Sequence, residues 1–227
     1  MKRVRWLSAH WPVSMTTLAG NMSKQLFTVE SFDGFIIDRI RDNLIEGSFV
    51  EKLSYQEKIT DPFGNEQVFD RVTYRNVEFT LHSEFPNIEL RNAHKNARLL
   101  ISKLLELCNF SVAIVPVKAD LLKWVEAFQE MINQKLLIDS LQISEFQLEA
   151  GVSAKILIKG DRDVIEALSN LSGNRKFLLD KVQVKIPRGH KLTSIQMASN
   201  GTVTIPDDYF NDFSGVLRDC LAKANKP

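Results

Sequence analysis

Alternation of apolar with mainly polar residues in three segments most constrains how this chain can fold. The pattern occurs in Val77–His82, Ser153–Lys159 and Lys181–Ile186. Because successive side chains of a β-strand point to opposite faces, each segment predicts a strand with one buried face and one solvated face. In the third segment the solvated face carries two lysines and a glutamine.

Turn and helix signals place further elements around these strands. Asp61–Asn65 contains Pro and Gly between two extended stretches, Phe49–Thr60 and Glu66–Ser83, and therefore predicts a hairpin. Apolar residues at helical spacing predict five helices: Asp33–Ile45 followed by Gly47, Asn92–Leu107, Ala119–Ile132, a segment capped by Asp161 or Asp163, and a terminal segment after Ile205.

The order of the elements favours the α+β class. Two strands, a helix and another strand follow one another in residues 136–187, which is typical of an antiparallel sheet packed by helices and not of a doubly wound parallel sheet. We therefore expect mainly antiparallel sheets packed by helices, divided into two α+β subdomains, 24–133 and 134–227.

Residues 1–23 are predicted to be a disordered extension. Met1–Leu7 resembles the start of a signal peptide, but polar residues and Pro12 interrupt the apolar stretch that a signal peptide requires. Methionines recur at positions 15 and 22, and patterned sequence begins at about Leu26. We interpret this segment as the product of an upstream start codon.

Composition removes several classes of protein. Lys and Arg number 29 and Asp and Glu number 28, so a surface that binds nucleic acid has to be a local patch. No apolar run approaches the roughly 20 residues that span a bilayer, and we expect a cytoplasmic protein with no membrane partner. Cys108 and Cys220 lie among apolar neighbours and are interpreted as buried thiols.

The chain carries no recognisable catalytic signature. The glycine patterns of P-loop and dinucleotide-binding proteins are absent, and the four histidines lie in separate segments without a second ligand at metal-binding spacing. We therefore expect no cofactor, no metal and no catalytic residue. One alternative stays open, a divergent metal-dependent nuclease. Its candidate residues are Asp139, Glu145, Glu149 and Lys155.

Two clusters of basic residues stand above the background. Arg91, Lys95 and Arg98 are spaced as one face of the predicted helix Asn92–Leu107. Lys181 and Lys185 share a strand face, and the turn after them adds Arg188 and Lys191. Because Lys and Arg on such ridges bind phosphate largely without regard to sequence, we expect all seven residues to contact duplex DNA or another nucleic acid.

The second half of the chain resembles the RexA family of phage-exclusion proteins and its DNA-binding relatives. The resemblance rests on the order of elements in residues 110–227: a strand at Val152–Lys159, a helix at Asp161–Leu171, a strand at Leu179–Ile186, the segment Ser194–Met197 and a terminal helix. It implies a dimer that binds duplex DNA in defence against phage. The other alternative is a protein-interaction subunit of a multi-component system.

Overall fold

The structure is a computed structural model that describes residues 1–92, 97–173, 175–188 and 191–225. The chain is an α+β protein with mainly antiparallel sheets, as the order of elements predicts. It divides into two compact units, and each is built from separated segments. Unit 1 contains Met1–Ala9, Phe85–Arg91 and Ile114–Pro227, and unit 2 contains His10–Glu84 and Asn92–Ala113.

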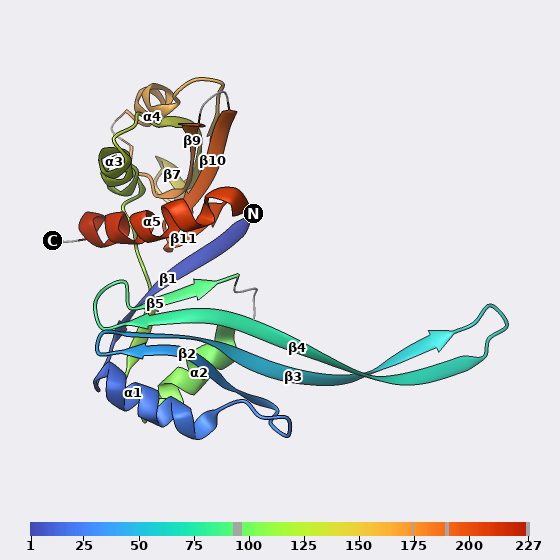
Figure 1. Cartoon of the computed structure of the whole chain (residues 1–227). Coiled ribbons are helices and arrows are strands. Elements are labelled where there is room, and N and C mark those ends of the chain that lie inside the picture. Colours follow the sequence, from blue (N-terminus) through green and yellow to red (C-terminus); the bar gives the residue numbers. More distant parts are fainter. Residues whose placement is uncertain (93–96, 174, 189–190, 226–227) are drawn as a thin grey trace. The chain divides into compact units, whose positions relative to one another are not determined.

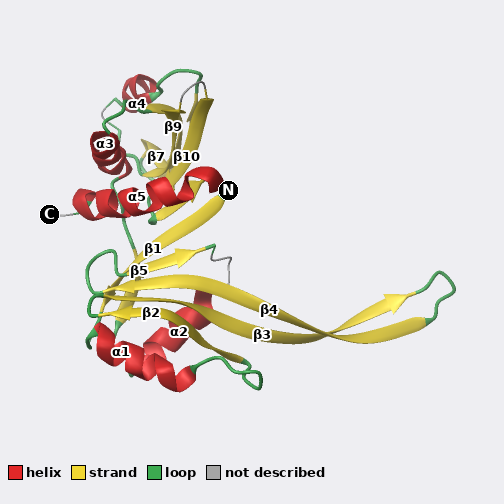
Figure 2. Ribbon diagram, viewed as in Figure 1, coloured by secondary structure: helices red, strands yellow, loops and turns green. Residues whose placement is uncertain are grey.

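The sheet of unit 1 has the strand order β5-β1-β11-β10-β9-β7-β8, with β6 also paired to β1. Figures 1 and 2 label β1, β5, β7, β9 and β10 among these strands. Its strands are β1 (Lys2–His10), β5 (Ile88–Arg91), β6 (Ala113–Pro116), β7 (Leu137–Glu149), β8 (Val152–Lys159), β9 (Leu179–Arg188), β10 (Lys191–Ala198) and β11 (Thr202–Ile205). The helices of this unit are α3 (Leu121–Ile132), α4 (Ile165–Ser172) and α5 (Phe210–Ala224), which follows the short 3₁₀ helix η2 (Asp207–Tyr209).

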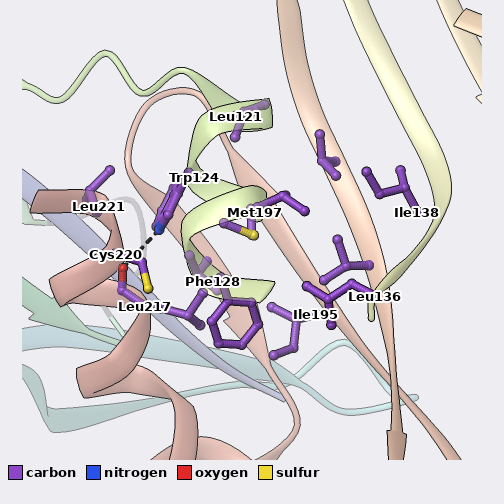
Figure 3. Close-up of a cluster of buried hydrophobic side chains, with 14 of the residues drawn as sticks. Leu121, Trp124, Phe128, Leu136, Ile138, Ile195, Met197, Leu217, Cys220 and Leu221 are labelled. Atoms are coloured by element: carbon purple, nitrogen blue, oxygen red, sulfur yellow. Dashed lines mark hydrogen bonds between the residues drawn. The ribbon is translucent and has the colours of Figure 1, made fainter. Parts of the chain in front are cut away.

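One face of this sheet is buried under the three helices. Trp124 of α3 donates a hydrogen bond from Nε1 to the Leu217 carbonyl of α5 over 2.9 Å, and its ring meets the Trp6 ring edge-on with centroids 5.9 Å apart. Figure 3 shows this core, where aliphatic side chains of the strands pack against both helices. Cys220 is fully buried in it, and burial raises the pKa of its thiol to about 11.

Unit 2 is built on the antiparallel strands β2 (Asp33–Arg41), β3 (Leu44–Thr60) and β4 (Glu66–His82). Helices α1 (Met15–Met22) and α2 (Ala97–Leu107) and the 3₁₀ helix η1 (Ser23–Gln25) complete it. The rings of Phe49 and Phe79 both contact Phe35 edge-on at the centre of its core. None of the helices that the structure describes is long and apolar enough to cross a membrane.

The predicted hairpin is confirmed. Strands β3 and β4 pair from Leu44 and His82 to Thr60 and Glu66, and the distal part projects as a two-stranded arm, defined here as residues 52–74 (Figure 1). Asp61 organises its tip: one carboxylate oxygen accepts hydrogen bonds from the Phe63 and Asn65 amides at 2.8 Å, and the other accepts from the Asn65 side chain. These bonds lower the pKa of Asp61.

Three predictions about the first half of the chain are wrong. Residues 1–23 are not a disordered extension, because Lys2–His10 forms a strand between β5 and β11 and Met15–Met22 forms a helix with buried Leu18. The predicted boundary between two subdomains at 133/134 is also wrong, because strands β1 and β5 belong to unit 1 together with the C-terminal segments.

The third error is the helix predicted at Asp33–Ile45, where β2 turns directly into β3. Gly47 does not end a helix. It lies opposite Ile37 beside an irregularity in the strand pairing, and a Cβ atom at this position would collide with the Ile36 carbonyl oxygen. Glycine is therefore required by the close approach of two strands.

Candidate nucleic-acid interface

The cluster predicted on β9 lies on the face of the unit 1 sheet that is opposite the helices. The aliphatic residues Val182, Val184 and Ile186 are buried in the core, so Lys181, Gln183 and Lys185 point the other way. Directly opposite residues of paired strands share a face. The register therefore adds further polar residues to this surface: Gln142 on β7, Ser194 and Gln196 on β10, Thr202 and Thr204 on β11, and Arg3 and Arg5 on β1. We call this surface the open face.

Lys185 differs from Lys181 in what it contacts on the open face. The Lys185 Nζ lies 3.0 Å from Oδ2 of Asp139, and the Gln183 side chain donates to the same oxygen over 3.1 Å. Asp139 is only 2% exposed. Because a buried carboxylate has to be paired, Lys185 compensates a charge of the protein itself, whereas Lys181 makes no ion pair with the residues that the structure describes.

Arg188 and Lys191 pair with each other through their backbones at the end of the β9–β10 hairpin, as the predicted turn requires. The two residues between them lie outside the described residues. The hairpin therefore brings these two basic positions together at the end of the strand that carries Lys181.

The predicted helical cluster is not formed as expected. Arg91 ends strand β5 and lies opposite Val4, on the helix-bearing side of the sheet. Its Nε donates to Glu89 over 2.7 Å, and its guanidinium lies 6.0 Å from the Phe210 ring centroid. Arg91 therefore supports the start of α5 on the face opposite to Lys181, and the two predicted clusters do not share a surface in unit 1.

The other members of that cluster fall elsewhere. Lys95 lies outside the described residues. Arg98 is an exposed residue near the start of α2, in unit 2. The spacing of 91, 95 and 98 is thus not a spacing along one helix, because the strand that ends at Arg91 interrupts it.

The structure adds Arg3 and Arg5 to the basic residues of the open face, although both were predicted to lie in a disordered segment. Both lie on β1, opposite Thr204 and Thr202 of β11. Arg3 and Lys181 line one pocket of about 190 Å³ on the open face. The signal was present in the sequence, because the two arginines alternate with Val4 and Trp6, which are fully buried.

Two carboxylates of β7 and β9 already have partners among the described residues. Asp139 is occupied by Lys185 and Gln183, and Asp180 accepts a hydrogen bond from the Gln142 side chain over 3.0 Å. Arg3 and Arg5 lie on β1, and Lys181 lies on β9. Arg3 and Lys181 are the two cations that line the pocket.

The nuclease residues do not form a metal centre in the described part of the chain. Across residues 1–92, 97–173, 175–188 and 191–225, no three His, Cys, Asp or Glu side chains gather at metal-binding distance. Asp139, the most buried of the predicted acids, is held by a lysine and an amide.

Comparison with known proteins provides no family for this chain. No protein-family model matches it, and no curated protein matches it significantly. The resemblance to the RexA family therefore stays a prediction.

Proposed function

We propose that this chain is a non-enzymatic nucleic-acid-binding protein whose open face contacts phosphate. The observation that supports this is the division of one sheet into two chemically different faces. The strands bury aliphatic residues under α3, α4 and α5 and present arginine, lysine, glutamine and threonine on the other side. These are the side chains that commonly donate to phosphate oxygens.

The composition of the open face also favours one mode of binding. The residues that define it include no aromatic ring, so stacking of unpaired bases is not the expected contribution. Contacts to the phosphate backbone with little sequence preference are expected, on duplex DNA first. The resemblance to the RexA family suggests a biological setting for this binding, the exclusion of phage by a dimer.

The test is fluorescence anisotropy with duplex DNA, single-stranded DNA and RNA across a salt series. Binding to duplex is expected, with the logarithm of the association constant falling linearly with the logarithm of salt concentration. Lys181→Glu should weaken binding and lower the salt slope by about one. Lys123→Glu is the matched control, because Lys123 is an exposed lysine of α3 on the helix side. If none of the three polymers binds even at low salt, the proposal is wrong.

A second candidate function, self-association, is supported by the arm of unit 2. The arm exposes large apolar side chains without a helix over them, including Tyr55 at 54% and Ile59 at 47% on β3. Its charges are largely satisfied internally, since Arg71 pairs with Glu57 and Lys58 pairs with Glu66. An apolar, internally neutral surface of this kind fits a protein partner better than phosphate.

The sequence of β3 supports a second copy of this chain as that partner. Strand β2 pairs with β3 only as far as Glu51, so the edge beyond it is open to another strand. Antiparallel pairing of two copies about Gln56 would place Leu53 opposite Ile59 and would oppose no like charges.

Light scattering after size-exclusion chromatography tests the second candidate. The wild-type chain should elute with the mass of two copies, and Leu53→Lys combined with Ile59→Lys should elute as one, because lysines would then face each other. Phe63→Lys at the tip is the control and should remain paired. A wild-type chain that elutes as a single copy at every concentration would refute self-association.

A further inference from the structure

The pocket on the open face is lined mainly by cationic and polar side chains. Its lining consists of Arg3, Lys181, Gln196, Ala198, Asn200, Thr202 and Thr204. Two of these residues are cations, two carry amides and two carry hydroxyls, and none is acidic. All of them except Asn200, which lies in the β10–β11 turn, belong to neighbouring strands of one sheet, so their spacing is fixed by the register of β1, β11, β10 and β9.

Two hydrogen-bonding groups beside this pocket lack partners. Thr202 is 6% exposed, and its Oγ1 is buried without a hydrogen bond. Arg5 lies directly opposite Thr202 across the β1–β11 pair, and its Nε is also buried without a partner. Leaving a buried polar group unpaired destabilises the folded state, so such groups usually have a structural or functional explanation.

The chemistry of these two groups specifies the missing partner. The Nε of arginine can only donate, and the threonine hydroxyl has a hydrogen to donate. A group that satisfies both must therefore be an acceptor, and the cations around it favour a negative one. Thr202 is itself one of the residues that line the pocket, so an acceptor bound there would lie beside this side chain.

We infer that this pocket is a phosphate subsite of the open face, with Thr202 as its buried donor and Arg3, Arg5 and Lys181 as its charged partners. The inference builds on the proposed function and deepens it, because it assigns one phosphate group to defined side chains. That phosphate is either an internal one of the strand or a terminal 5′ phosphate. Both have the acceptor oxygens that the pocket requires.

The experiment compares three variants on a short oligonucleotide that carries a label at its 3′ end. Thr202→Val keeps the shape of the residue but removes its donor, and it should weaken binding about tenfold, as expected for a hydrogen bond to a charged group. The salt slope should not change, because threonine carries no charge. Thr202→Ser retains a donor and should bind like the wild type. Thr193→Val is the matched control, since Thr193 is buried equally, at 6%, on the adjacent strand β10.

Inorganic phosphate and the 5′ end of the oligonucleotide separate the remaining outcomes. Phosphate should compete with the oligonucleotide for the wild-type chain and compete less well for Thr202→Val. A 5′ phosphate that strengthens binding through Thr202 identifies the terminal group as the ligand, and equal binding of both ends identifies an internal phosphate.

Failure of the subsite can be distinguished from failure of the proposed function. If oligonucleotides bind and Thr202→Val binds as tightly as the wild type, the subsite is wrong and the nucleic-acid surface stands. If no nucleic acid binds but inorganic phosphate binds in a way that depends on Thr202, the proposed function is wrong and the anion pocket stands. If neither ligand binds, both are refuted.

Discussion

The open face of unit 1 and the arm of unit 2 are both antiparallel β-surfaces without a helix over them, and they differ in what their side chains can bind. The open face carries Arg3, Arg5 and Lys181 among hydroxyls and amides. The arm carries exposed Tyr, Val, Ile and Phe side chains and pairs its own charges. The kind of partner that an uncovered strand pair can bind therefore depends on the charge balance of its exposed residues.

The two surfaces also differ in how firmly they are tied to a core. On β1, the open-face residues alternate with residues that are buried under α3 and α5. Arg5, for example, lies between the buried residues Val4 and Trp6. The distal arm is held mainly by the pairing of β3 with β4. Substitutions should therefore affect stability in unit 1 and leave it almost unchanged in the arm.

The largest effect is expected from Trp6→Ala. Trp6 is fully buried, packs against Trp124 and donates a hydrogen bond to Glu89 over 3.0 Å. Its removal should lower the free energy of unfolding by about 3–5 kcal/mol, as measured by urea denaturation followed by circular dichroism. Phe63→Ala at the exposed arm tip is the control and should change the same quantity by less than about 0.5 kcal/mol. A loss of under about 1 kcal/mol for Trp6→Ala would restore the prediction of a disordered N-terminal segment.

A smaller effect should separate the two lysines of β9 from each other. Lys185→Met removes the cation beside Asp139, whose side chain is 2% exposed, and should cost about 1–3 kcal/mol because a buried carboxylate loses a partner. Lys181→Met removes no ion pair found in the described structure and should leave stability unchanged while weakening nucleic-acid binding. Denaturation and anisotropy on the same two proteins provide both measurements. Equal stability losses in the two variants would contradict the conclusion that only Lys185 stabilises the fold through its ion pair with Asp139.

The elements that local sequence determines were predictable, and those that long-range pairing determines were not. Asp61–Asn65 fixes its turn with hydrogen bonds inside five residues, and the alternation of Lys181–Ile186 needs only one buried face. By contrast, Asp33–Ile45 has apolar spacing that suits a helix as well as two strands, and pairing with β4 decides between them.

The candidate site was half predictable for the same reason. Lys181 and Lys185 were assigned to one strand face from their spacing alone. The contribution of Arg3 and Arg5 depends on β1 entering the sheet between β5 and β11, whose residues lie more than 80 and nearly 200 positions away. The pairing of Lys185 with Asp139 depends on an irregularity in the β7–β9 register between Ile138 and Ser140, which no local pattern indicates.

The smallest effect concerns the arm tip, where acid should loosen the turn without affecting the sheet at its base. The Asn65 side chain and neighbouring amides lower the pKa of Asp61 below its ordinary value of 3.8. A carboxyl whose pKa is lower in the folded state stabilises that state above the ordinary pKa, and the stabilisation is lost as pH falls through the folded value. The Phe63 and Asn65 amide resonances should therefore titrate together in NMR spectra, with a midpoint below 3.8. Amides of Phe49 and Phe79 in the covered part of the same strands should not follow that titration, and Asp61→Ala should abolish it. A midpoint at or above the ordinary value would mean that the tip is open at neutral pH, and the apolar side chains near it would then be presented by a mobile loop instead of a fixed surface.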